Sequence, residues 1–226
     1  MDETAKEWSQ MKVRKFPLLA IAVVCLAGLL LAGFTRARDR YSVSQLRERP
    51  LTLPVPLVQQ SNGTSCGEAV MTMAYNYAYP GRPLSEPQII KYAADSGSYF
   101  EDLSPFTSPE NMVKIARHYA DNVSTGWVFT AGAGLSLLIQ RLRNDEPVLI
   151  DVLSDFYDPS SVAHFIVVTG ITVDPSRGDA VVIHYNDPLT GTRRSADWKG
   201  SRGLWNAWQT NNDPGGPGWW LVISPP

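Results

Sequence analysis

The chain has 226 residues, of which 44% are hydrophobic and 19% are charged, and its formal net charge is −2. This is the composition of an ordinary globular protein with room for one sizeable domain. The small net charge predicts no nucleic-acid partner. The two cysteines, Cys25 and Cys66, do not suit a disulfide framework, and the three histidines are too dispersed to predict a metal site. We therefore expect neither a metal nor an organic cofactor, and the sequence sets no oligomeric state.

A run of 19 residues without a charged side chain, from Phe16 to Phe34, follows an N-terminal tail over residues 1–15. As a helix this run would be about 28 Å long, which is close to the hydrocarbon thickness of a bilayer. A cleaved secretory signal is the alternative, but its apolar core is usually about 7–15 residues long. The run therefore predicts a retained single-pass membrane anchor over residues 16–34.

The orientation of this anchor does not follow from its flanks, because three basic residues lie on each side. A short tail before a large folded domain is typical of an exported domain, so we expect residues 35–226 outside the cytoplasmic membrane. Asn62-Gly-Thr64 is an N-glycosylation acceptor, and a glycan there would obstruct the neighbouring Cys66. A functional site at Cys66 therefore favours a bacterial chain.

Residues 35–56 are first charged and then rich in proline, and we interpret them as a linker. Residues 57–226 are expected to form one domain. Its first half predicts helices over Cys66–Tyr79, from Ser85 onward, from Ser108 onward and over Leu135–Arg143, with a short strand over Trp127–Thr130. Its second half predicts strands over 147–153, 164–169, 180–185 and 218–223. Helices followed by antiparallel strands predict an α+β domain whose first helix packs on a sheet.

Cys66 is the only cysteine outside the uncharged run, and its local sequence is typical of a thiol nucleophile. Gly67 favours a tight loop, and the apolar residues that follow predict a helix that begins at Cys66. Unpaired backbone N–H groups and the helix dipole stabilise an anion at that position, and a thiolate is such an anion. Gln60, six residues upstream, is expected to donate its side-chain amide to an oxyanion. A buried structural cysteine is the alternative.

A thiol nucleophile needs a basic partner, and that base needs a group that holds it. His164 opens an apolar strand directly after a polar loop, so we expect it at a strand end that faces a cleft. Asp187 closes the next strand. If the two strands pair antiparallel, the start of one lies beside the end of the other, and His164 and Asp187 become neighbours. The segment Asp174–Asp179 between the strands is suited to a hairpin turn.

Three other residues compete for these roles. His184 is expected to face the opposite side of its strand, because successive side chains alternate between the two faces of a sheet. His118 falls on a helix among surface residues and is expected to face solvent. Asn186 is an alternative holder of the histidine, but a carboxylate such as that of Asp187 also stabilises the imidazolium.

Two aromatic segments have both a structural and a functional interpretation. The loop Gly97–Ser108 holds three aromatic residues and is expected either to line a substrate groove or to cover the core. Near the end of the chain, five tryptophans are expected to pack against a final helix and strand, with a sugar or substrate platform as the alternative: Trp198, Trp205, Trp208, Trp219 and Trp220.

Three of these motifs, taken in order, resemble the peptidase C39-like branch of the papain-fold cysteine peptidases. They are Gln60–Gly67, His164–Ile171 and Tyr185–Pro188. The resemblance covers most of residues 54–226 and implies a papain-like fold. Members that cut double-glycine leader peptides are usually joined to an ABC transporter, whereas this sequence contains neither a six-helix membrane domain nor a phosphate-binding loop. The substrate of those members therefore does not carry over.

The family implies a Cys–His–Asp triad with an oxyanion hole supplied by a glutamine, and these roles carry onto this chain as Cys66, His164, Asp187 and Gln60. The leading hypothesis is a membrane-tethered cysteine peptidase that hydrolyses a peptide or polypeptide. Two alternatives stay open. One is a catalytically silent module that binds a peptide or a membrane partner, and the other is a transferase that passes the acyl group to an amine.

Overall fold

The computed structural model describes residues 46–104 and 106–226. They belong to one folded unit that spans Tyr41–Pro226. The anchor predicted over residues 16–34 lies outside the described residues and stays a prediction. In the part of the chain that the structure describes, no helix has the length and apolar character needed to cross a bilayer.

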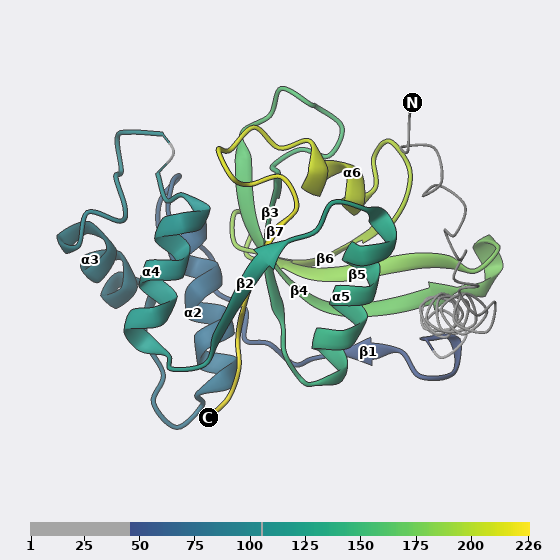
Figure 1. Ribbon diagram of the computed structural model, residues 1–226, viewed down its shortest axis with the longest axis horizontal. Helices are drawn as coiled ribbons and strands as arrows, with labels where there is room; N and C mark the ends of the chain where they lie inside the picture. The colour runs from purple at the N-terminus through teal and green to yellow at the C-terminus, as the bar shows by residue number, and fades with distance from the viewer. Residues whose placement is uncertain (1–45, 105) are drawn as a thin grey trace, which may run out of the picture. The chain divides into compact units, whose positions relative to one another are not determined.

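A seven-stranded antiparallel sheet forms the centre of the domain, in the order β2-β7-β3-β4-β5-β6, and β1 pairs with β4 (Figure 1). The strands are β1 (Leu51–Thr52), β2 (Val123–Trp127), β3 (Val148–Leu153), β4 (Ala163–Asp174), β5 (Ala180–Asp187), β6 (Thr192–Asp197) and β7 (Trp219–Ile223). Every residue of β3 is buried, because elements cover both faces of this central strand. That burial explains its unbroken apolar run, interrupted only by Asp151.

Among the described residues, five α-helices accompany the sheet: α2 (Cys66–Ala78), α3 (Glu86–Asp95), α4 (Pro109–Tyr119), α5 (Ala131–Arg143) and α6 (Leu204–Gln209). Figure 1 shows α2, α3 and α4 grouped together, with α2 and α5 on opposite sides of the strands between them. Helix α2 packs on β4 and β3, and α6 packs on β3. The mixed helical and antiparallel architecture confirms the predicted α+β class.

The predicted helix starts coincide with local capping interactions. Ser108 accepts a hydrogen bond from the backbone N–H of Asn111 at 3.2 Å, and Pro109 occupies the first helical position of α4. Ser85 and Gln88 form a capping box at the start of α3. These contacts are local in sequence, which is why the sequence predicts them.

Two predicted boundaries are wrong. The strand predicted over Trp127–Thr130 lies instead over Val123–Trp127, where it pairs with β7. Thr130 is the N-cap of α5, since its hydroxyl accepts from the backbone N–H of Ala133 at 3.2 Å, and the helix therefore begins before Leu135. Apolar β-branched character at 128–130 favoured a strand, but capping by Thr130 determines the structure there.

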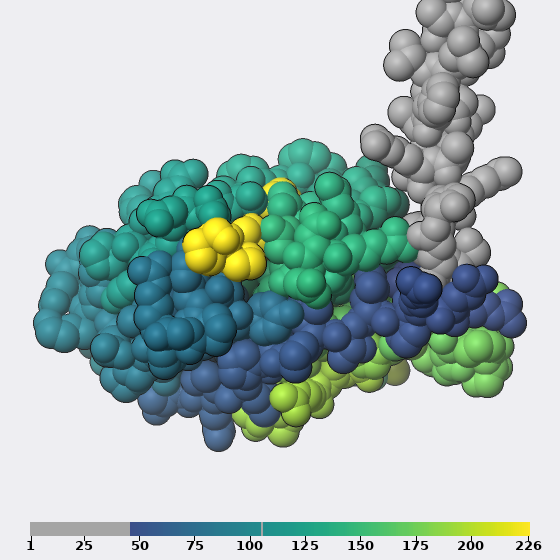
Figure 2. Space-filling model, turned by 90° about the horizontal axis from the view of Figure 1, so that it is seen from below, coloured from purple at the N-terminus to yellow at the C-terminus, as the bar shows by residue number. Residues whose placement is uncertain are grey.

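The predicted linker also needs correction, because residues 46–56 belong to the folded unit. Leu46, Leu53 and Val55 are buried in the core, and β1 pairs with β4. Apolar side chains at alternate positions anchor this proline-rich segment to the domain. In Figure 2 the dark-blue segment that precedes α2 runs as a continuous band across the face of the molecule.

Three of the five C-terminal tryptophans are buried in the core, and Trp205 and Trp220 are partly buried against it. Trp198, Trp208 and Trp219 are among the largest fully buried side chains of the domain. The indole N–H of Trp208 donates to the backbone oxygen of Trp219 at 2.7 Å, so its single polar atom is satisfied. Strand β6 was not predicted, since its sequence Thr-Arg-Arg-Ser-Ala-Asp is almost entirely polar, as suits an exposed edge strand.

Candidate active site

Cys66 is the first residue of α2 and carries a free, half-buried thiol. Gly67 lets this helix start lie close to two neighbouring elements. A Cβ added at Gly67 would lie 2.9 Å from Met112 Sδ on α4 and 3.5 Å from Phe165 on β4. The absence of a side chain at Gly67 therefore lets the start of α2 lie close to the start of β4, where His164 is found.

His164 and Asp187 meet where β4 begins and β5 ends. The two strands pair antiparallel, with Val167 opposite Asn186. Both side chains are buried, and His164 Nε2 lies 2.9 Å from Asp187 Oδ1. The structure thus confirms that these two residues are neighbours.

The thiol of Cys66 completes this arrangement. It lies beside the imidazole of His164 and contributes to raising the pKa of that ring. Because Nε2 is committed to Asp187, Nδ1 is the ring atom that remains for the sulfur. Burial lowers the pKa of His164, but the hydrogen bonds and charges of Asp187 and Cys66 outweigh it and raise the pKa to about 9. The imidazole is therefore protonated at neutral pH.

Asp187 is surrounded by hydrogen-bond donors. Oδ1 accepts from His164 and from the backbone N–H of Leu189 at 3.0 Å. Oδ2 accepts from Thr190 Oγ1 at 3.1 Å and from Arg194 Nη1 at 3.0 Å. Burial alone would raise the pKa of Asp187, but His164, Arg194 and Thr190 hold it well below its usual range. The carboxylate therefore stays charged and fixes the ring of His164.

The competing residues lie elsewhere. His184 Nε2 is paired with Thr172 Oγ1 at 2.8 Å, and His118 is exposed and stacks on Tyr92 with ring centroids 3.7 Å apart. Asn186 Nδ2 donates to the backbone oxygens of Val55 and Pro56, at 3.4 and 3.3 Å. None of these contacts involves the thiol or the imidazole of the site.

Gln60 is tied to the end of β5, because its backbone N–H donates to Pro188 O at 3.0 Å. Its side-chain Nε2 donates to the backbone oxygen of Asn62 at 2.7 Å. A primary amide carries two N–H groups, so one remains for another acceptor. Among the described residues, Gln60 Oε1 has no hydrogen-bond partner despite its burial.

Glu86, at the start of α3, is a site residue that the sequence did not predict. Its carboxylate accepts from the backbone N–H of Ser61 at 3.0 and 3.1 Å and from Ser65 Oγ at 2.7 Å. It is 5% exposed and so forms these bonds out of water. One carboxylate thus holds both ends of the loop that joins Gln60 to Cys66.

Glu86→Gln is expected to lower kcat/KM about tenfold, since an amide NH₂ would then face the donor groups of the loop and displace it. The alkylation rate of Cys66 by iodoacetamide should fall in parallel. Glu110→Gln, on the exposed face of α4, is the matched control and should change neither rate. Unchanged alkylation and turnover in Glu86→Gln would show that the loop does not depend on this carboxylate.

Two further acids lie beside the site, Asp151 on β3 and Asp213 after α6. Burial, followed by the nearby charge of Asp213, raises the pKa of Asp151 well above its usual range. Burial also raises the pKa of Asp213. Both carboxyl oxygens of Asp151 are buried and have no hydrogen-bond partner among the described residues. A single buried acid in an apolar strand is a sequence signal for such a pair, but its partner cannot be read from the sequence.

Two cavities border the site. A cavity of about 290 Å³ is lined by Cys66, with Phe106 and Asp213 among its walls. A larger cavity of about 590 Å³ is lined by His164 and Asp187. The aromatic loop was expected either to line a substrate groove or to cover the core. Phe106 lines the cavity beside the thiol, which agrees with the first expectation. Among residues 46–104 and 106–226, no group of three or more metal-ligating side chains is arranged to hold an ion.

A thiol at a helix N-terminus, beside an imidazole held by a carboxylate, is the arrangement of thiol-dependent hydrolases. Residues 52–212 match the sequence model of the Peptidase_C39 like family. The match covers more than half of the chain, which therefore belongs to this family of cysteine peptidases. A search of curated protein sequences finds no match to the chain.

Proposed function

We propose that this chain is a cysteine peptidase in which Cys66 is the nucleophile, His164 the proton carrier and Asp187 the group that orients the imidazole. The observation that carries the proposal is the contact between the Cys66 thiol and an imidazole that Asp187 holds from its other side. Family membership supports the same reaction class.

In the proposed first step, Cys66 attacks the substrate carbonyl carbon as a thiolate, while the protonated His164 beside it holds the proton. The new C–S bond displaces the C=O π electrons onto oxygen. The backbone N–H of Cys66 and the free N–H of Gln60 Nε2 are proposed to donate to this oxyanion. A charged oxygen at the start of α2 is also stabilised by the helix dipole.

In the second step, the tetrahedral intermediate breaks its C–N bond, and His164 gives its proton to the leaving amine. The acyl group remains on Cys66 as a thioester. Water then attacks this carbonyl while His164 takes a proton from it, and the C–S bond breaks. The sulfur of Cys66 leaves as a thiolate beside the protonated His164, so the site returns to its first state.

Incubation of the full chain with a defined peptide library in H₂¹⁸O tests this proposal against its alternatives. Hydrolysis places ¹⁸O in each newly formed carboxyl group, which mass spectrometry detects, and prior treatment with iodoacetamide should abolish it. Products joined to an added amine instead would identify the transferase. Absence of any thiol-dependent product, together with alkylation of Cys66 no faster than a free thiol, would favour the silent binding module.

A further inference from the structure

The two cavities lie on chemically different sides of the site. The smaller one is lined by Cys66 and does not include His164, whereas the larger one is lined by His164 and does not include Cys66. The acyl part of a substrate becomes attached to the sulfur of Cys66. The leaving amine must instead lie beside the imidazole that protonates it. Residues that follow the scissile bond are therefore directed towards the larger cavity.

Four basic and three acidic side chains line this larger cavity, in addition to His164. Two of the acids are already paired with two of the bases. Asp187 pairs with Arg194 at 3.0 Å, and Asp197 pairs with Arg177 at 2.9 Å. The two charges within each pair neutralise each other. The charged side chains outside these pairs therefore determine which substrate side chains the cavity attracts.

The remaining bases are Lys199 and Arg202. Neither forms an ion pair with another residue that the structure describes. The guanidinium of Arg202 lies over the ring of Tyr157, 4.5 Å from its centroid, and this contact holds the cation at the cavity wall. The remaining acid, Asp155, accepts a hydrogen bond from the backbone N–H of Tyr157 at 2.8 Å.

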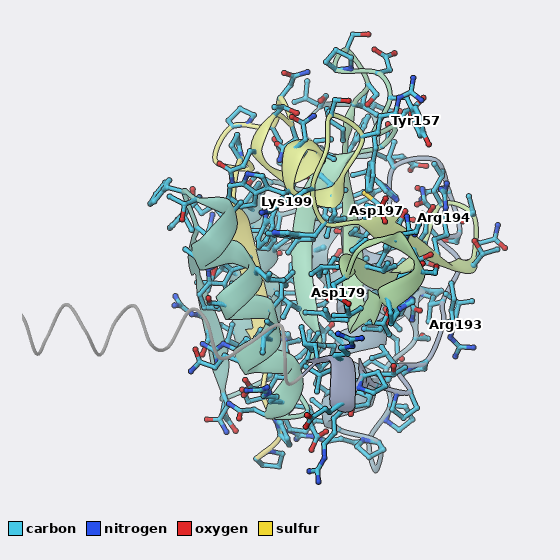
Figure 3. The ribbon with its side chains drawn as sticks, turned by 90° about the vertical axis from the view of Figure 1, so that its right-hand side faces the viewer. Tyr157, Asp179, Arg193, Arg194, Asp197 and Lys199 are labelled. Atoms are coloured by element: carbon cyan, nitrogen blue, oxygen red, sulfur yellow. The ribbon has the colours of Figure 1, made fainter. Side chains whose placement is uncertain are left out.

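Figure 3 looks onto this side of the molecule and labels several of the charged residues. Tyr157, Arg194 and Lys199 all line the cavity. Arg193 is labelled in the same view but lies apart from them, and it is not a lining residue. The chain thus offers an exposed arginine next in sequence to Arg194 that does not face the cavity.

We propose that this cavity selects peptide substrates with an aspartate or glutamate on the leaving-group side of the scissile bond, recognised by Lys199 and Arg202. This inference rests on the proposed peptidase function. A cavity of this size accommodates one or two residues of a peptide. Protonated His164 adds a further positive charge to its wall, so an acidic residue is favoured over a basic one.

The test profiles cleavage of a proteome-derived peptide library by the full-length protein and compares the residues found after each cleaved bond. The wild-type chain should enrich Asp and Glu at one of the first three of these positions. The double variant with Lys199→Glu and Arg202→Glu should shift the ratio of acidic to basic residues there about tenfold towards Lys and Arg. Both preferences should weaken as salt is added, because the charges are exposed.

Arg193→Glu is the control, since it reverses one charge outside the cavity, as each of the two substitutions does inside it, and it should leave the profile unchanged. A wild-type profile with no acidic preference, or an equal shift caused by Arg193→Glu, would overturn the inference while leaving the peptidase intact. Absence of any cleavage that depends on Cys66 would instead overturn the proposed function, and the inference with it.

Discussion

Cys66→Ala is expected to lose peptide hydrolysis by about 10⁴- to 10⁶-fold, because no other described side chain in the site replaces the thiol as a nucleophile. The loss should appear in kcat, with little change in KM, since the thiolate forms its bond to the substrate only during the reaction. Steady-state rates on any peptide found to be cleaved, measured with equal amounts of purified protein, give the comparison.

The same variant should fold normally, with a melting temperature within about 3 °C of the wild type, because alanine suits a half-buried helix start. His184→Gln is a useful companion, since it removes a histidine that is paired with Thr172 and not with the thiol. It should retain activity within about threefold. Hydrolysis that persists in Cys66→Ala would show that the nucleophile is a different residue.

Asp187→Asn is expected to lower kcat by about 10²- to 10⁴-fold. The four groups around Asp187 all donate hydrogen bonds, two to each oxygen. An asparagine must turn its NH₂ towards one of these pairs of donors. Either His164 and Leu189 or Thr190 and Arg194 then lose their acceptor, and the imidazole loses both its orientation and the charge that keeps it protonated.

The pH profile distinguishes this electrostatic role from a loss of packing. In the wild type, the pKa of His164 is raised from 6.5 to about 9, so the stability that its protonated form contributes is fully present below about pH 6.5 and is lost as the pH rises through about 9. Asp187→Asn removes the largest contribution that raises this pKa, and burial then lowers it. The fall in activity and in unfolding free energy at high pH should therefore move to lower pH. A basic limb that stays near pH 9 in the variant would mean that Asp187 does not set it.

The predictable parts of this protein depend on patterns that are local in sequence. Gly67 followed by an apolar run predicts that a helix begins at Cys66, and alternation along two neighbouring strands predicts which histidine faces the same side as Asp187. Antiparallel pairing then brings His164 and Asp187 together. Each of these predictions uses only the side-chain periodicity of a helix or strand, or the hairpin that joins two neighbouring strands.

The parts that the sequence did not predict depend on contacts between distant segments. Glu86 looks like an ordinary acidic residue in the first turn of a helix, and only the packing of α3 reveals that it holds Ser61 and Ser65. Likewise, Asp213 lies in the loop after α6, and only the folded chain brings it near Asp151 on β3. A carboxylate gives no sequence signal of the donors that surround it in the folded chain.

The position of β7 has a consequence for the biosynthesis of the enzyme. This strand comes last in the sequence, yet it lies between β2 and β3 inside the sheet, and Trp219 packs edge-on against Phe165, next to His164. Ribosomes deliver Cys66 first, the β4–β5 hairpin later and β7 last. The sheet that aligns the thiol with its imidazole is therefore incomplete throughout most of translation. A nascent chain thus carries Cys66 before the strand that fills the gap between β2 and β3 has been synthesised.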